Sequence, residues 1–373
     1  MKSECFVRRT NPRLLGAALA VAGLVGATAL AGCGIVEETA GATGKVAPEL
    51  SSVSALKDPR SYDGPSTAVV ADDTVRAVAA GAPQLPVTVT DSQGTKVTVT
   101  DTSRILALDI YGTLSRTVYE LGQGSRLVGR DISTQFPEAA KLPLVTHNGH
   151  ELNAESILAL NPTVVLTDTS LGPWDVILQL RASGIPVVVT DSQRNLNNVD
   201  EITQQVAQAL GVPAAGTALN ARINTKLAAT RAEIARVAPK DDTRKLRTMF
   251  LYARGASGTY YMFGEGSGAD SLIDALGLYD VAAEIGWKGS KPITDEGIVA
   301  AQPDVVLMMT KGLESVGGVD KLLDRFPALA ATPAGQHRRV VDMADAEILG
   351  YGPITPQVLN ALAVAVYAPD AVT

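Results

Sequence analysis

The chain has 373 residues and a formal net charge of −7, and it has no block of Lys and Arg beyond its first residues. This charge distribution argues against nucleic acid as a partner. The only cysteines are Cys5 and Cys33. The length is sufficient for two domains with hydrophobic cores of their own.

Residues 1–33 have the organisation of a secretory signal peptide. A basic start precedes an apolar run over residues 14–31, which ends in Leu-Ala-Gly-Cys33. This ending resembles the bacterial lipobox, which implies that Cys33 is lipidated and anchors the protein to the outer face of the cell membrane. An ordinary signal peptide with a chance cysteine is the alternative. Since Cys5 leaves with the signal, the mature fold is expected to have no disulfide and no cysteine-based metal site.

Two segments precede the main fold. Residues 34–85 are rich in Ala, Ser, Thr, Gly, Pro and Asp and have weak apolar spacing, which predicts a flexible tether. Residues 86–101 contain two alternating β-branched runs around a turn with a glycine, a pattern typical of a β-hairpin.

From residue 104 onward, short apolar strands alternate with helical segments. Strands are expected over residues 105–109, 163–167, 184–190, 247–253, 304–309 and 340–343. Residues 199–238 interrupt this alternation with two helical patterns, of which the second, from about 214 to 237, is long enough to connect two lobes. A closing helix is expected over residues 356–367.

The two halves of this pattern repeat. Residues 155–166 match residues 296–307 as Glu-x-Ile-x-Ala-x-x-Pro-x-Val-Val-Leu, which is a helix, a Pro stop and a buried strand in both copies. The pattern predicts an α/β fold of two similar lobes with mostly parallel central sheets and a single long connecting helix. The expected division is an N-terminal lobe over 86–198, linking helices over 199–238 and a C-terminal lobe over 239–373.

The lipobox, the duplicated halves, the long helix and the repeated element together resemble the helical-backbone class of solute-binding proteins of ABC importers. The resemblance covers about residues 86–370. It implies a monomeric extracytoplasmic receptor that captures haem, a siderophore or cobalamin between its lobes and delivers it to a membrane permease and ATPase.

Four segments resemble the haem branch of this class. They are residues 148–155, with His150, residues 252–255, with Tyr252 and Arg254, and residues 264–277 and 349–353. Ile354 departs from the pattern, which has Arg at this position. The resemblance implies that haem is the cargo, with His150 and Tyr252 as axial ligands of its iron.

The chemistry of these residues agrees with that role. Neutral imidazole and tyrosinate are both axial ligand types for haem iron. Positions i and i+2 of a strand point to one face, so Arg254 is placed to donate to the Tyr252 oxygen and favour its ionised form. His147 lies on the same loop as His150, and the sequence leaves open which of them is the ligand. His337 is expected at the surface.

Further candidates have weaker support. Trp287, Met309 and Tyr351 are expected to line an apolar slot for the porphyrin, although each residue type is more often part of a core. The glycines of residues 264–268 before a helix suggest an anion cradle. Glu138 and Glu284, one in each half, are candidates for surface carboxylates that dock on the transporter.

Three alternatives remain at this point. The same fold can bind a ferric siderophore or cobalamin, which would need no axial ligands from the protein. A receptor for zinc or manganese would need more ligands than these motifs offer. A haem-dependent enzyme is the third alternative. The sequence has no nucleophile with a matched base and no phosphate-binding loop, so a binding protein without catalysis is expected.

Overall fold

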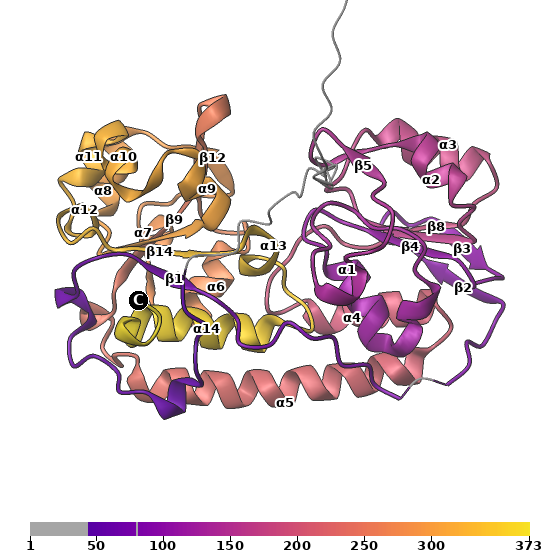
Figure 1. The fold of residues 1–373 in the computed structure, drawn as a ribbon, viewed down its shortest axis with the longest axis horizontal. Helices are drawn as coiled ribbons and strands as arrows, with labels where there is room; N and C mark the ends of the chain where they lie inside the picture. Colours follow the sequence, from indigo (N-terminus) through magenta and orange to yellow (C-terminus); the bar gives the residue numbers. More distant parts are fainter. Residues whose placement is uncertain (1–43, 80) are drawn as a thin grey trace, which may run out of the picture. The chain divides into compact units, whose positions relative to one another are not determined.

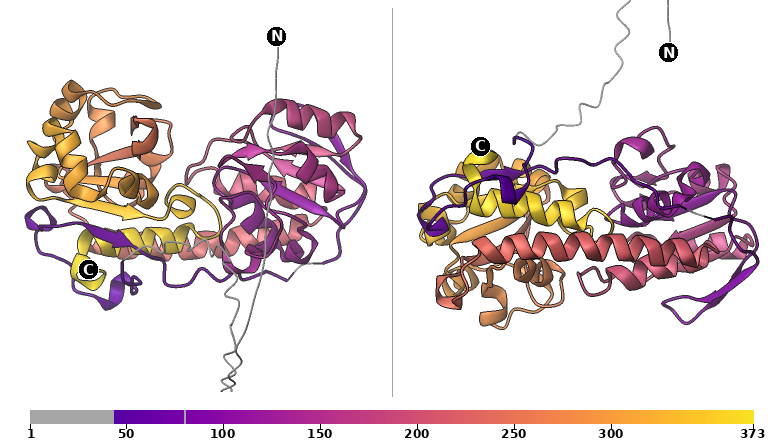
Figure 2. Two further views of the ribbon diagram at one scale, coloured as in Figure 1. Left: turned by 45° about the horizontal axis from the view of Figure 1, so that its top comes forward. Right: turned by 90° about the horizontal axis from the view of Figure 1, so that it is seen from below.

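The computed structural model of the protein describes residues 44–79 and 81–373, so the predicted signal peptide and Cys33 lie outside the described residues. Two sheets organise the described chain (Figures 1 and 2). We call the part around the three-stranded sheet the N lobe and the part around the seven-stranded sheet the C lobe. Helix α5 (Pro213–Val237) runs along both lobes (Figure 1). None of the described helices is long and apolar enough to cross a membrane.

The N lobe has a parallel sheet in the order β4-β7-β8, and every residue of these strands is buried. Alternate residues of a strand face opposite sides of the sheet. Ala107 therefore packs in one core cluster with α1 and α4, and Leu106 packs in another with α2 and α3. The elements are β4 (Ile105–Leu108), α1 (Thr113–Val118), β5 (Thr146–His147), β6 (Glu151–Leu152), α2 (Ala154–Ala159), β7 (Val164–Thr167), α3 (Trp174–Ala182), β8 (Val187–Val189) and α4 (Val199–Ala209).

The C lobe has a mixed sheet in the order β1-β14-β13-β9-β10-β12, with β11 paired to the start of β9. Strands β1, β14, β13 and β9 are parallel, and β10 and β12 are antiparallel additions at one edge. Its elements are β1 (Ser66–Ala68), β9 (Arg247–Arg254), β10 (Thr259–Phe263), α6 (Ala269–Ala275), β11 (Tyr279–Asp280), α7 (Val281–Glu284), β12 (Ser290–Pro292), α8 (Asp295–Ala301), β13 (Val305–Met309), α9 (Thr310–Ser315), α10 (Gly318–Arg325), α11 (Pro327–Ala330), α12 (Pro333–Gln336), β14 (Val340–Met343), α13 (Asp345–Ile348) and α14 (Thr355–Tyr367).

The predicted fold class, α/β with mostly parallel sheets and one long connecting helix, is confirmed. The predicted hairpin is also present, as β2 (Val87–Thr90) paired antiparallel with β3 (Lys96–Val99). The internal repeat folds in the same way in both halves, as α2 followed by β7 and α8 followed by β13. Each of these helices is capped by a side chain that accepts a backbone N–H, Asn153 in the first copy and Thr294 in the second.

The expected tether is wrong for the described residues between 44 and 85, because they form part of the fold. Strand β1 lies within this segment and pairs in parallel with β14 at one edge of the C-lobe sheet. Ala47 and Leu50 are buried in the main core. Farther along, the backbone N–H of Val78 donates to the Glu120 carbonyl in the N lobe at 2.8 Å. We call residues 44–79 the N-terminal strap, since they contact both lobes.

Arg339 fastens the strap to the C lobe from inside. Its side chain is 1% exposed and donates to the Ser66 hydroxyl of β1 at 2.8 Å and to the carbonyls of Ala365 and Val366 at 2.7 and 3.1 Å. Burial lowers the pKa of Arg339 to about 10, so the guanidinium still carries its charge at neutral pH. These carbonyls end α14, where a helix has no amide donors of its own.

We expect Arg339→Met to lower the free energy of unfolding by roughly 3 kcal/mol, because it leaves buried acceptors without a donor. Arg338→Ala is the matched control, since the neighbouring Arg338 is exposed and, among the described residues, its side chain pairs only with Asp320 on the surface. The control should cost less than about 1 kcal/mol. Urea unfolding followed by circular dichroism measures both, and equal losses would contradict the role of Arg339.

Candidate ligand-binding site

A cavity of about 480 Å³ is lined by residues of both lobes. Its size lies within the range of roughly 300 to 1,000 Å³ that is usual for small-molecule sites. The lining side chains include several apolar ones and a small charged group. They are Ile110, Tyr111, Ile132, Ser133, Gln135 and His150 from the N lobe and Tyr252, Arg254, Phe263, Met309, Lys311, Asp345, Ala346 and Leu349 from the C lobe.

Tyr252 is placed by a ladder of aromatic rings on β9 and β10. Its ring stacks on Phe263 with centroids 5.7 Å apart and planes at 12°, and Phe263 stacks in turn on Phe250 at 5.3 Å. Such stacked pairs add about 0.5 to 1.5 kcal/mol beyond their buried area. The ladder therefore fixes the ring of Tyr252 at the carboxyl end of β9, against the cavity.

Arg254 lies two residues farther along the same strand and covers the Tyr252 ring. The guanidinium carbon is 4.5 Å from the ring centroid, which is a cation–π contact. Its nitrogens donate to the Asp345 carboxylate at 2.7 Å and to the Ala253 carbonyl at 2.8 Å. The expected shared face is observed, but these bonds go to Asp345 and Ala253 where the sequence suggested the Tyr252 oxygen as acceptor.

His150 reaches the cavity from the opposite lobe, at the turn of the short β5–β6 hairpin. Asn148 and Gly149 both take positive φ in this turn, at 45° and 89°. Burial, followed by the charges of Arg254 and Lys311, lowers the pKa of His150 against the opposing effect of Asp345. His150 is therefore neutral over more of the pH range than an ordinary histidine, and a neutral imidazole is the form that binds a metal.

The other two histidines do not line this cavity. His147 points its Nδ1 toward the Asn153 side chain at 3.5 Å. His337 is on the surface, where its Nδ1 lies 2.7 Å from Asp63. Among the three histidines, the structure thus brings only His150 together with Tyr252 and Arg254.

Only one of the three residues that were expected to line the porphyrin slot lines the cavity. Met309 lines the cavity, whereas Trp287 and Tyr351 do not. Trp287 packs elsewhere in the C lobe and donates to the Met262 carbonyl at 3.0 Å. Tyr351 is 3% exposed, and its hydroxyl donates to the Gly268 carbonyl at 2.6 Å. Both are held in place as parts of the packing, so the prediction that they line the slot is wrong.

The glycines before α6 are not an open anion cradle. The Asp270 carboxylate of the helix itself accepts the backbone N–H groups of Gly266 and Gly268 at 2.8 and 3.0 Å. These glycines line a different, polar cavity beside Arg231. The carboxylate already occupies the donors that an external anion would use.

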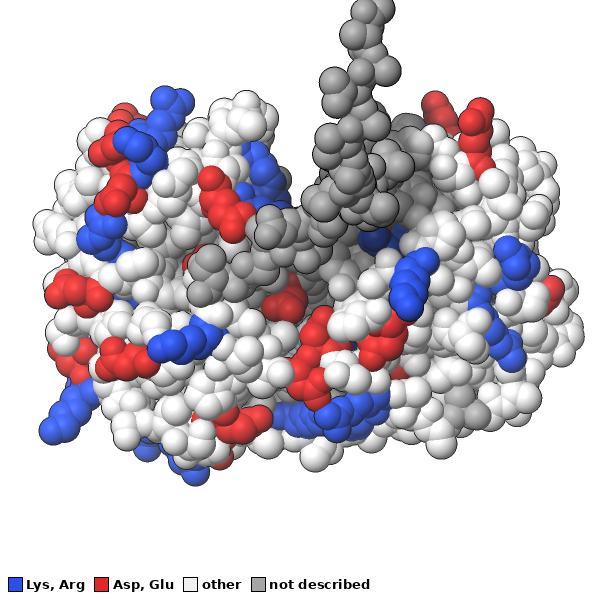
Figure 3. Space-filling model, in the orientation of Figure 1, with Lys and Arg blue, Asp and Glu red and all other residues white. Residues whose placement is uncertain are grey.

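The docking candidates Glu138 and Glu284 are both exposed. Glu138 accepts the backbone N–H of Val75 at 3.1 Å, and Glu284 pairs with Arg247 at 2.7 Å. Glu284 contacts the amino end of β9 through Arg247, whereas Tyr252 and the cavity lie toward the carboxyl end of this strand. Acidic and basic side chains are interspersed on the face shown in Figure 3.

Several lining residues escaped the sequence analysis, among them Tyr111, Lys311 and Asp345. They follow β4, β13 and β14 closely, at the carboxyl ends of parallel strands. Ligands of parallel α/β sheets bind at these ends, so the strand assignments could have identified them. Phe263 gave no such signal, because it lies on the antiparallel strand β10.

A buried polar cluster supports Tyr111 in the N lobe. The Arg194 guanidinium lies 5.8 Å from the Tyr111 ring centroid and binds Asp168 at 2.6 Å and Asp109 at 3.4 Å. All three charged side chains have 1% exposure or less. Burial raises the pKa of Asp109 to about 7 and that of nearby Asp131 to about 6. The shorter contact indicates that Asp168 is the ionised partner of Arg194.

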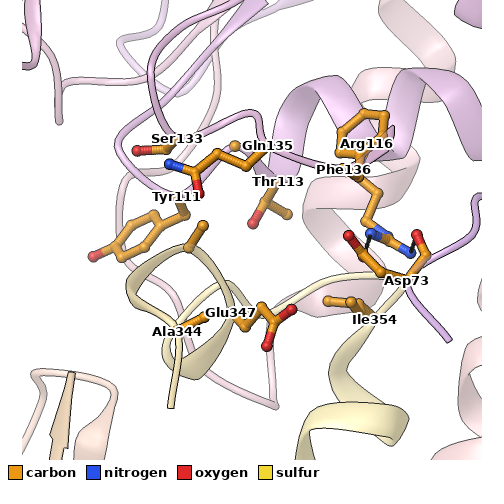
Figure 4. A pocket seen from close by; sticks show the side chains of 12 residues that line it. Asp73, Tyr111, Thr113, Arg116, Ser133, Gln135, Phe136, Ala344, Glu347 and Ile354 are labelled. Atoms are coloured by element: carbon orange, nitrogen blue, oxygen red, sulfur yellow. Dashed lines mark hydrogen bonds and ion pairs between the residues drawn. The ribbon is translucent and has the colours of Figure 1, made fainter. Parts of the chain in front are cut away.

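A second, small cavity of about 70 Å³ adjoins the first, between α1 and α13 (Figure 4). It shares Tyr111 with the main cavity and holds the Arg116–Asp73 ion pair at its far end. Glu347 of α13 also lines it, and burial together with the charge of Asp73 raises the pKa of Glu347 to about 7. The space suits a few water molecules.

Two α/β lobes, a long helix along both and a ligand-sized cavity lined from each lobe define a bilobed solute-binding protein. The family described as periplasmic binding protein matches residues 110–346, which is more than half of the chain. The chain belongs to this family.

Several solved structures are similar to this chain. A heme binding protein, HmuT, is 38% identical with a TM-score of 0.78, over 83% of this chain and 99% of that one. The periplasmic heme-binding protein RhuT of Roseiflexus sp. RS-1 is 39% identical with a TM-score of 0.64, over 72% and 99% of the two chains. HutB, a periplasmic heme binding protein of Vibrio cholerae, is 26% identical with a TM-score of 0.60, over 71% and 98%.

A more distant relative is named for a different ligand. A cobalamin-binding protein of Halobacterium salinarum is 27% identical over 226 residues, which is 60% of this chain and 58% of that protein. The match thus spans less than two thirds of the relative's length.

The titration of Asp109 should make stability depend on pH. In the unfolded chain this carboxyl titrates near 3.8 and in the fold at about 7, so the folded protein binds an extra proton between these values. Its contribution to stability is present below about pH 4 and is lost as the pH rises through about 7. Asp109→Asn keeps the shape and removes the titration. We expect urea midpoints of the variant to fall less than those of the wild type between pH 4 and 7.

Asp324→Asn is the control, because Asp324 is exposed and its side chain pairs only with Lys321 in the part of the chain that the structure describes. It should leave the pH profile of the midpoints as in the wild type. If Asp109→Asn has the same slope as this control, the proton is not held at Asp109.

Proposed function

We propose that this protein is an extracytoplasmic receptor that binds haem and delivers it to an ABC importer for iron acquisition. The observation that carries the proposal is the convergence of His150 and Tyr252, from opposite lobes, on one ligand-sized cavity. A planar macrocycle between the lobes would offer one face of its iron to each of these side chains. Imidazole and tyrosinate are both axial ligand types for haem iron.

The walls of the cavity suit a porphyrin. Apolar side chains are present on both sides, with Ile110 and Ile132 in the N lobe and Phe263 and Met309 in the C lobe. Arg254, with its guanidinium over the Tyr252 ring, is the proposed support of this tyrosine as an iron ligand.

The similar structures support the same three residue types. The HmuT structures include variants in which an arginine, a tyrosine and a histidine are each replaced by alanine. The tyrosine and the arginine are two positions apart in that chain, as are Tyr252 and Arg254 here. The histidine precedes the tyrosine by about 100 positions, as His150 precedes Tyr252.

The proposal includes a lipid anchor at Cys33 and contacts with the transporter. Lipidation of Cys33, removal of residues 1–32 and attachment to the outer face of the membrane follow from the lipobox. The permease and ATPase are the proposed partners, and a monomer is the proposed state. Glu138 and Glu284 remain candidates for docking, although Glu284 would first have to leave Arg247.

Cobalamin is the second candidate ligand, because of the more distant relative that is named for it. A cobalamin site needs neither of the two axial side chains. Removal of either residue therefore distinguishes the candidates.

We expect the signal-free protein to bind ferric haem with a stoichiometric, shifted Soret band. His150→Ala and Tyr252→Ala should each change the band position and weaken binding, since each removes an axial ligand. Arg254→Ala should keep both ligands and weaken binding on the order of tenfold, as expected for loss of a supporting contact. Absorption titration measures all four proteins.

His147→Ala is the matched control, because His147 is on the same hairpin and does not line the cavity. Its spectrum should equal that of the wild type. No saturable band with the wild type would contradict the proposal, and tight binding of cyanocobalamin in the same assay would favour the second candidate.

A further inference from the structure

The charges around the cavity are unevenly paired. Besides His150 and two tyrosines, three charged side chains line it, namely Arg254, Lys311 and Asp345. Arg254 and Asp345 neutralise each other through the ion pair at 2.7 Å, with side chains 32% and 20% exposed. One positive charge, that of Lys311, is left over.

Lys311 is placed by the same carboxylate that holds Arg254. It lies in the first turn of α9, directly after β13, and its backbone N–H donates to Asp345 at 3.0 Å. Its side chain is exposed to the cavity. Within the described residues, its ammonium group has no ion pair or hydrogen bond to the protein.

Lys311 faces the same cavity as the two proposed axial ligands. Its side chain lines this cavity together with Tyr252 of its own lobe and His150 of the opposite lobe. A ligand that contacts both His150 and Tyr252 would therefore occupy the space that this ammonium group borders. Arg254 is less available, because two of its nitrogens already donate to protein oxygens.

We propose that Lys311 binds a carboxylate at the edge of the ligand and so selects an anionic macrocycle over a neutral one of the same shape. This inference rests on the proposed function, since the two propionates of haem are the carboxylates in question. Pairing would neutralise the leftover charge and would orient the macrocycle in its plane, which axial ligands alone leave free. Lys311 is thus a specificity residue that touches the side arm and not the iron.

The test compares ferric haem with its dimethyl ester, in which both carboxylates are masked, in the same detergent-containing buffer. Lys311→Ala should weaken haem binding about threefold to tenfold, as expected for a partly exposed charged pair. Lys311→Glu should weaken it further. Neither variant should weaken binding of the ester, and the Soret position of bound haem should stay that of the wild type, because both axial ligands remain.

Lys321→Ala serves as the matched control, since Lys321 is exposed on α10, pairs with Asp324 and does not line the cavity. It should bind both probes like the wild type. Raising the salt concentration should weaken haem binding by the wild type more than by Lys311→Ala.

Two results would overturn the inference while the proposed function stands. One is equal weakening of haem and ester by Lys311→Ala, which would indicate a structural role. The other is unchanged haem binding by both Lys311 variants. Failure of the wild type to bind haem at all would overturn the proposed function, and this inference with it.

Discussion

The Asp345 carboxylate connects three strand ends of the C lobe. Asp345 follows β14, accepts the guanidinium of Arg254 at the end of β9, and accepts the backbone N–H of Lys311 just after β13. Through Arg254 it also fixes the cation over the Tyr252 ring. Without this carboxylate, the Arg254 guanidinium and the backbone at Lys311 would each lose a hydrogen-bond acceptor. The cation that covers the Tyr252 ring would then no longer be held in place. The electrostatics of the cavity depend on Asp345 in two ways. It neutralises Arg254 and leaves Lys311 as the unpaired cation of the described cavity lining. Its negative charge also opposes the lowering of the pKa of His150.

The two walls of the cavity are supported in different ways. In the N lobe, the charged side chains of Arg194, Asp109 and Asp168 lie beneath the wall, shielded from solvent behind the Tyr111 ring that lines the cavity. In the C lobe, charged groups are themselves part of the wall. A low-dielectric environment strengthens the buried pairs and makes them costly to rearrange. The N-lobe wall is therefore the more rigid support, and discrimination by charge falls to the C lobe.

The sequence predicted those features that local patterns encode. The repeated pattern of a helix, a proline (Pro162 or Pro303) and a buried strand revealed two equivalent halves. The i, i+2 spacing of Tyr252 and Arg254 placed both side chains on one face of their strand. The strap was missed because its composition is that of a linker, and its three-residue strand is stable only through pairing with β14. Trp287 and Tyr351 were misplaced for a related reason, since side-chain type does not reveal which face of an element a residue occupies.

The strap also bears on how the lobes are held around the ligand. Helix α5 has 25 residues and spans about 37 Å, so it connects the lobes as one stiff rod. The strap makes a second connection: the backbone N–H of Leu56 donates to the Tyr367 carbonyl in the C lobe, and Asp73 pairs with Arg116 in the N lobe. A rotation that opened the cavity widely would have to bend the rod and also break the contacts at one end of the strap. With two connections the distance between His150 and Tyr252 is constrained from the back of the molecule. Such preorganisation lowers the entropy cost of holding one ligand between two side chains from different lobes.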